Sequence, residues 1–271
     1  MRYLRAAAVL IFAACLVLNI WANLRHNSRN NTEGPTIESQ SDTLNLSVSD
    51  GADALLQGLT ATDSQDGDLT EQILVASSSY FVEPGVFDVD YVVFDSHHNS
   101  TQYTRRVSYS DYTAPKFHVS QPLVFVRGEN IRYLNYITAA DCLDGDLTEQ
   151  IKVKASNVSN YTAGVYPVLL EVTNSHGDRV EAELNVVVLE RAATGPKIVL
   201  TEYLSYVTAG ERFDPYKLIQ SVTNTAGESV NRGQVNVVGS VDTERPGSYQ
   251  LIFSYDDGTA EGRTYMTVIV A

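Results

Sequence analysis

Three stretches of the chain place an apolar side chain at every second position. They run from Phe87 to Val93, from Tyr166 to Val172 and from Tyr249 to Tyr255. Successive side chains of a strand point to opposite faces of a sheet, so this period of two predicts three strands with one face in a core. The opposite face of an antiparallel sheet is expected in water, and the residues predicted on it are Asp88, Asp90, Glu171, Gln250 and Ser254.

Each of these stretches continues into a polar turn and then a second β-type run. The turns are Asp95–Asn99, Asn174–Asp178 and Asp256–Gly258, whose short side chains can bond their own backbone. The following runs span residues 103–110, 180–189 and 263–270, and each pair of runs predicts a β-hairpin. After residue 30 no apolar stretch has the 3.6-residue period of a helix, so this part of the chain is expected to be all-β.

An exact repeat defines the organisation of the chain. The octapeptide Asp-Gly-Asp-Leu-Thr-Glu-Gln-Ile occurs at 66–73 and again at 144–151, which are 78 residues apart. Such an identity predicts duplicated modules, and a third, diverged copy is indicated by Pro246-Gly247-Ser248-Tyr249. The predicted boundaries are 43–113 for module 1, 114–191 for module 2 and 194–271 for module 3. Short linkers that end in Pro115 and Pro196 predict semi-rigid joints in an elongated rod.

The amino-terminal segment predicts export. Arg2 and Arg5 lie in a short cytoplasmic stretch, 1–5, before the apolar residues 6–22, which would rise about 25 Å as a helix and form a transmembrane signal anchor. The alternatives are a cleaved secretory signal with a poor cleavage site at Ile20-Trp21-Ala22, a lipoprotein site at Cys15 and a buried core helix. Residues 23–42 are polar and predict a flexible linker.

Composition agrees with a location outside the cell. All 33 acidic residues lie after residue 29, against 15 of the 19 Lys and Arg, so this part carries a formal charge of −18. An acidic surface repels polyphosphate, and nucleic acid is therefore not expected as a partner. The two cysteines, Cys15 and Cys142, provide no disulfide framework. Each module must be stabilised by its own apolar core.

The motifs resemble bacterial immunoglobulin-like (Ig-like) repeats. The run from Asp63 to Thr70, with Pro84-Gly85-x-Phe87-x-Val89-x-Tyr91 and the Asp95–Asn99 turn, is similar to a repeat of unknown function that is also found in a pesticidal crystal protein. Module 2 matches as well, with Asn174 in place of an Asp. Module 3 resembles the group 3 bacterial Ig-like domain. The resemblance implies three tandem Ig-like β-sandwich modules after an N-terminal transmembrane helix.

The acidic loops are the candidate metal site. Asp63, Asp66 and Asp68 lie within six residues of each other, and Asp141, Asp144 and Asp146 repeat them. Carboxylates at this spacing suit Ca²⁺, which takes six to eight oxygens. The alternative is that Gly67 and Gly145 supply a left-handed turn and that the aspartates bond backbone donors. No other cofactor is implied by the sequence.

The function expected from these features is non-catalytic. The chain carries no motif of a nucleophilic, zinc-dependent or nucleotide-dependent enzyme, although an acidic sequence alone does not exclude a glycosidase. We expect a cell-surface stalk, adhesion or protein-interaction protein of a Gram-positive bacterium, single-pass with an extracellular C-terminal region, or secreted after signal cleavage. The alternative is a glycan- or peptide-binding receptor with calcium-stabilised loops.

Overall fold

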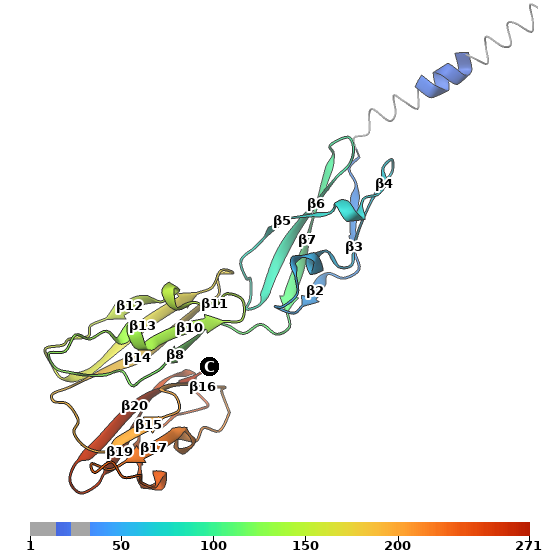
Figure 1. Cartoon of the computed structure of the whole chain (residues 1–271). Helices are drawn as coiled ribbons and strands as arrows, with labels where there is room; N and C mark the ends of the chain where they lie inside the picture. The colour runs from blue at the N-terminus through green and yellow to red at the C-terminus, as the bar shows by residue number, and fades with distance from the viewer. Residues whose placement is uncertain (1–14, 23–32) are drawn as a thin grey trace, which may run out of the picture. The chain divides into compact units, whose positions relative to one another are not determined.

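The computed structural model describes residues 15–22 and 33–271 and divides the chain into two compact units, Met1–Tyr112 and Thr113–Ala271. From residue 33 onward the regular structure consists of strands and short 3₁₀ helices (Figure 1). The prediction of an all-β protein is therefore confirmed. Both cysteines are free.

Only part of the predicted membrane span can be compared with the structure. Residues 15–22 are helical, and residues 6–14 lie outside the described residues. Among residues 15–22 and 33–271, no helix has the length and apolar content that a membrane crossing needs. The transmembrane anchor thus stays a prediction.

Module 1 is built from two sheets that enclose one core (Figure 1). One sheet has the order β1-β3-β4 and the other the order β2-β7-β6-β5. Strand β2 runs parallel to β7, and the other neighbours are antiparallel. The elements are β1 (Thr36–Ser39), β2 (Thr43–Leu46), η1 (Ala52–Leu56), β3 (Leu59–Asp63), β4 (Gly67–Asp68), η2 (Thr70–Gln72), β5 (Leu74–Ser78), β6 (Val86–Phe94) and β7 (Ser100–Tyr109).

The first strand corrects one sequence prediction. Strand β1 lies inside residues 23–42, which were predicted to be a flexible linker. It pairs with β3, and Ile37 faces the core with 8% of its surface exposed. A strand of four residues with one apolar side chain has no readable period, so the polar composition of the segment was misleading.

The core of module 1 contains the side chains that the alternating pattern selected. Phe87, Val89, Tyr91 and Val93 are each at most 2% exposed. Arg105 was not expected among them, yet it is only 2% exposed. Its guanidinium donates to the carbonyls of Leu55 and Gln57, at 2.5 and 2.7 Å, and to the Tyr91 hydroxyl at 3.3 Å. Arg105 therefore fixes the 3₁₀ helix η1 against the sheet.

Modules 2 and 3 repeat this arrangement. Their sheets have the orders β11-β10-β8 and β12-β13-β14-β9 in module 2, and β15-β17 and β16-β20-β19-β18 in module 3. Each larger sheet has one parallel pair, β9 with β14 and β16 with β20, equivalent to β2 with β7. The elements of module 2 are β8 (Lys116–Val119), β9 (Val124–Val126), η3 (Tyr133–Tyr136), β10 (Ile137–Asp141), β11 (Gly145–Asp146), η4 (Thr148–Gln150), β12 (Lys152–Ser156), β13 (Gly164–Thr173) and β14 (Arg179–Leu189). Those of module 3 are β15 (Lys197–Leu200), β16 (Leu204–Val207), η5 (Pro215–Leu218), β17 (Ile219–Thr223), η6 (Arg232–Gln234), β18 (Asn236–Val238), β19 (Gly247–Asp256) and β20 (Glu261–Val270).

Modules 2 and 3 also contact each other within the second unit. Leu204 of module 3 is 3% exposed and belongs to the apolar cluster of module 2, against which Tyr203 and Ile269 pack. The Ser248 hydroxyl donates to the carbonyl of Glu183 on β14 over 2.8 Å. The predicted rod-like joint is therefore wrong for this pair of modules, because their sheets share a packed interface that no local pattern reveals.

Candidate functional site

The acidic loops are tight turns between two short strands. In module 1 the loop joins β3 to β4, and in module 2 it joins β10 to β11. Gly67 and Gly145 have φ angles of 76° and 70°, a left-handed conformation that glycine adopts without a steric penalty. Both copies of the octapeptide contain this glycine because the turn requires a positive φ angle.

Within each loop, two aspartates accept hydrogen bonds from nearby backbone N–H groups. In module 1, Asp63 Oδ1 accepts from Gln65 and Asp66 at 2.7 and 2.9 Å, and Asp68 Oδ1 accepts from Thr70 at 2.9 Å. The side-chain and backbone hydrogen bonds from Thr70 hold the pKa of Asp68 below its usual value. These are the local contacts that the turn interpretation predicts.

Module 2 repeats these contacts. Asp141 Oδ1 accepts from the backbone of Leu143 and Asp144, at 3.1 and 2.7 Å, and Asp146 Oδ1 accepts from Thr148 N–H at 2.9 Å. As in module 1, the hydrogen bonds from the threonine lower the pKa of Asp146.

The middle aspartate of each loop bonds the following β-hairpin. Both oxygens of Asp66 accept from Ser96, one from its backbone N–H at 2.7 Å and one from its hydroxyl at 2.9 Å. Asp144 binds Ser175 in the same way, at 2.7 and 2.8 Å. We call each of these pairs a loop latch. The latches connect residues about thirty positions apart and fix one pole of each sandwich.

The hairpin turn of module 2 begins with Asn174, where that of module 1 begins with Asp95. The two side chains make different contacts. Asp95 is 7% exposed and accepts from the backbone of His97 and Asn99 and from the Asn99 side chain. Burial opposes ionisation, but these hydrogen bonds keep the pKa of Asp95 below its usual value. Asn174 makes the equivalent backbone bonds and also donates from Nδ2 to Asp141 Oδ2 at 2.9 Å. Module 2 thereby gains a third hydrogen bond between loop and hairpin, in addition to the two of its latch.

Module 3 also has a loop latch, but here the loop supplies the donor and the hairpin supplies the acceptor. The carboxylate belongs to the hairpin, where Asp257 Oδ2 accepts from the loop N–H of Thr225 at 2.7 Å. Asp257 Oδ1 also accepts from Thr259 and Ala260 in its own turn. These hydrogen bonds hold the pKa of Asp257 well below its usual range, and Thr225 makes the largest contribution to this shift. The sequence comparison missed this equivalence because the aspartate had moved to the opposite partner.

The loop aspartates are thus engaged in fixing the poles of the modules. Among residues 15–22 and 33–271, no group of three His, Cys, Asp or Glu side chains is arranged to hold a metal ion. The contacts favour the turn interpretation, and calcium binding by the six loop aspartates stays a hypothesis. Beside the latch of module 2 lies an open depression of about 440 Å³, lined by Asp144, Asp146, Leu147, Gln150, Thr173, Asn174 and Ser175.

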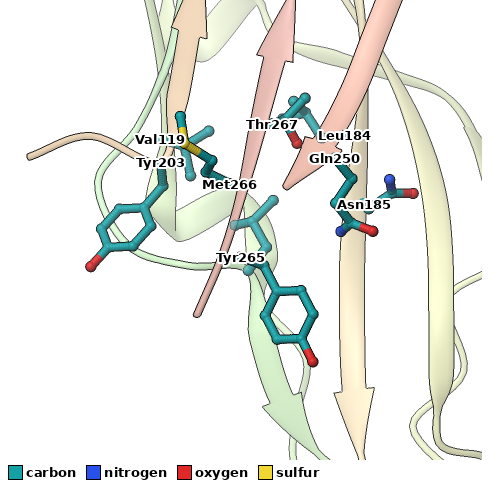
Figure 2. A pocket seen from close by; sticks show the side chains of 9 residues that line it. Val119, Leu184, Asn185, Tyr203, Gln250, Tyr265, Met266 and Thr267 are labelled. Carbon is teal, nitrogen blue, oxygen red and sulfur yellow. The ribbon is translucent and has the colours of Figure 1, made fainter. Parts of the chain in front are cut away.

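A second hollow lies between modules 2 and 3. Figure 2 shows residues of both modules around it, among them Leu184 and Asn185 from module 2 and Tyr203, Tyr265 and Met266 from module 3. Its volume is about 10 Å³, which is the space of a single water molecule. This hollow is therefore a packing feature of the interface, and it is too small for a substrate.

Comparison with known proteins confirms the resemblance to bacterial Ig-like repeats. Residues 205–268 match the bacterial Ig-like domain (group 3). The pesticidal crystal protein Cry22Aa of Bacillus thuringiensis is 30% identical over 207 residues, which cover 73% of this chain. The chain spans 27% of the length of that relative.

Several solved structures share a weaker similarity. The M60 catalytic domain with its CBM51 domains from Clostridium perfringens ZmpB has 13% identity and a TM-score of 0.24 over 87% of this chain and 30% of that chain. Drosophila N-cadherin EC1-3 has 11% identity and a TM-score of 0.31 over 85% of this chain and 98% of that chain. At these scores the similarities support no inference about function.

Proposed function

We propose that this chain is a non-catalytic extracellular protein that serves in adhesion or protein interaction at the surface of a Gram-positive bacterium. The observation that carries the proposal is the tandem array of Ig-like modules, in which residues 205–268 match the group 3 bacterial Ig-like domain. Such modules present loops and strand edges around a packed core, and they use their polar groups to fix those loops.

The ionised state of three loop carboxylates makes them unsuited to general acid catalysis. A glycosidase needs a carboxylic acid with a raised pKa to protonate the leaving group. Hydrogen bonds from Thr70, Thr148 and Thr225 instead lower the pKa values of Asp68, Asp146 and Asp257. These groups are ionised at neutral pH and are unsuited to act as general acids there.

The membrane attachment in this proposal rests on residues 6–22. Their apolar composition after Arg2 and Arg5 suits a signal anchor, and the charge of −18 beyond residue 29 suits a region that faces the medium. In the anchored form the modules stay with the cell. In the alternative form, cleavage near Ala22 releases them.

A second candidate function is a receptor for a glycan or peptide. The depression beside the latch of module 2 favours it, because its lining includes the exposed residues Asp146 and Gln150, whose carboxylate and amide groups suit sugar hydroxyls or a peptide backbone. The calcium hypothesis for the loops belongs to this alternative.

Cell fractionation with protease treatment tests the proposal. The full chain is expected in the membrane fraction, and protease added to intact protoplasts should degrade the modules while a cytoplasmic marker survives. A shortened chain in the medium would support secretion. Protection of the modules together with the marker would contradict an extracellular location.

A further inference from the structure

The two duplicated modules differ sharply at one edge of their larger sheets. Strand β5 of module 1 reads Leu-Val-Ala-Ser-Ser, and the equivalent strand β12 of module 2 reads Lys-Val-Lys-Ala-Ser. Each is the last strand of a four-stranded sheet, so one side of its backbone pairs with no other strand of the described chain. Both strands have a register irregularity at the same position. The difference lies at two positions, where Leu74 and Ala76 stand against Lys152 and Lys154, because the valine between them is shared and is 41% exposed in both modules.

The edge of module 2 carries charges. Lys154 Nζ lies 2.9 Å from Glu171 Oε2, and Arg179 lies 3.4 Å from the same oxygen. Glu171 was predicted to face water, but under these cations it is only 7% exposed, and the hydrogen bond from Lys154 lowers its pKa. Lysines on an edge strand oppose pairing with another chain, because pairing would strip their water. Module 2 thus has a protected edge.

The edge of module 1 is apolar instead. Leu74 pairs with Val92 where module 2 has Lys152 opposite Glu171. Five large apolar side chains on and around β5 are between 41% and 73% exposed, and we call this group the apolar edge: Leu74, Val75, Tyr80, Val82 and Phe94. Single exposed apolar residues are common, whereas a group around an unprotected strand indicates a contact surface.

The charge of module 1 indicates which kind of partner the apolar edge can bind. Residues 33–112 contain fourteen Asp and Glu against two arginines. Arg105 is buried, and Arg106 is paired with Asp88 at 3.1 Å. Glu71 and Glu83 are exposed on either side of β5 in the sequence. This field attracts a cationic partner, and it repels a second copy of the same module.

We propose that β5 is a docking edge for an extended, cationic polypeptide segment, which pairs with it as an additional strand. Main-chain hydrogen bonds to β5 supply the pairing, the apolar edge takes alternate side chains of the segment, and the surrounding carboxylates take its lysines or arginines. This inference rests on the proposed binding function and deepens it, since it names the surface and the chemistry of the partner.

Peptide binding to the full chain tests the inference. The probe is a peptide of about eight alternating Lys and Val residues, a common strand length, and an alternating Glu and Val peptide is its counterpart. We expect the Lys-Val peptide to bind and the Glu-Val peptide not to bind. Added salt should weaken the binding of the Lys-Val peptide. Replacing Leu74→Lys together with Ala76→Lys copies the edge of module 2 and should weaken binding at least about tenfold. Both side chains are exposed, so the variant should fold, as circular dichroism can verify.

A matched control separates pairing at the edge from general attraction. Thr43→Lys with Asn45→Lys makes the same charge change on β2, the opposite edge of the same sheet, where both residues are exposed. This control should bind nearly as the unchanged chain does. Amide hydrogen exchange should slow in β5 and not in β12 when the Lys-Val peptide is present.

Three results would overturn the inference. They are failure of the unchanged chain to bind the Lys-Val peptide, equal weakening by the two double variants, and self-association of the chain through β5 in sedimentation, which would make a second copy the occupant. None of these depends on where the cell places the protein, so the docking edge and the cell-surface location can fail separately.

Discussion

The hydroxyl of Tyr206 in module 3 accepts a hydrogen bond from the backbone N–H of Phe117 in module 2 over 2.9 Å. This contact joins β16 to β8, the first strand of module 2. Burial raises the pKa of Tyr206, and Lys116 Nζ lies 5.5 Å from the centroid of its ring. One side chain thus provides a polar and an aromatic contact across the interface between the two modules.

Replacing Tyr206→Phe should therefore destabilise the second unit. The backbone N–H of Phe117 loses its acceptor, and an unsatisfied, partly buried donor costs about 1–2 kcal/mol of unfolding free energy. Urea unfolding of residues 113–271 measures the change. Tyr249→Phe is the control, because that hydroxyl donates to the Arg245 carbonyl at an exposed position within module 3. An equal loss in both variants would argue against a special role of the interface.

The interface also predicts how modules 2 and 3 unfold. Each module has its own apolar cluster, so residues 114–191 and 194–271 are expected to fold separately. Module 2 alone loses its contacts with Leu204 and Tyr203, so it should melt at a lower temperature than within residues 113–271. Calorimetry should show one transition for the pair. Two transitions at the temperatures of the isolated modules would contradict this coupling.

The strands of the fold were predictable because their side chains alternate. The hairpin strands β6, β13 and β19 each show the period of two, and Val89, Leu170 and Phe253 are fully buried as that period predicts. Strand β1 was missed because four residues are too few for a period. The packing of Tyr206 on Phe117 joins positions 89 residues apart, and no local pattern reports a contact between modules.

Arg105 provides a test of a core contact that the sequence did not predict. Its guanidinium binds two carbonyls around η1 and stacks on Tyr91, at 5.4 Å from the ring centroid. Arg105→Leu keeps an apolar stem but removes these donors, so it should cost about 2–3 kcal/mol of unfolding free energy. Arg106→Leu is the matched control, since the exposed pair of Arg106 with Asp88 contributes less than about 1 kcal/mol. Denaturant unfolding of residues 33–112 measures both losses. Equal stability of the two variants would contradict the prediction.

The sequence predicts which residues form the candidate site, but it does not predict which groups they contact. The repeat singled out Asp66 and Asp144, but their partners Ser96 and Ser175 lie about thirty residues further along the chain. The turn and the hairpin meet only when both sheets of a module have packed. For the same reason the exchanged latch between Thr225 and Asp257 in module 3 could not be recognised from an alignment of acidic positions.

The low pKa of Asp257 predicts a loss of stability in acid. A carboxylate whose pKa is lower in the folded state contributes stability above its unfolded pKa of about 3.9, and this contribution disappears as the pH falls toward the folded value. The melting temperature of residues 113–271 should therefore fall below about pH 5. Asp257→Asn should flatten this dependence. Asp256→Asn, which removes a neighbouring charge whose Oδ1 accepts from the Gly258 N–H, should flatten it less.

The loop latches give the last prediction, which separates a turn from a calcium site. Asp66→Asn removes one of two oxygens that accept from Ser96, so residues 33–112 should lose about 1 kcal/mol of unfolding free energy even in chelator. Because both oxygens of Asp66 are already engaged, we expect the unchanged fragment to melt equally in calcium and in chelator. Bound calcium would instead stabilise it by about 2.7 kcal/mol at a hundredfold excess over the dissociation constant. The calcium site would be established, and the turn interpretation contradicted, if calcium raised the melting temperature of residues 33–112 and Asp66→Asn abolished this rise. Asp144→Asn should then have the same effect in residues 113–271.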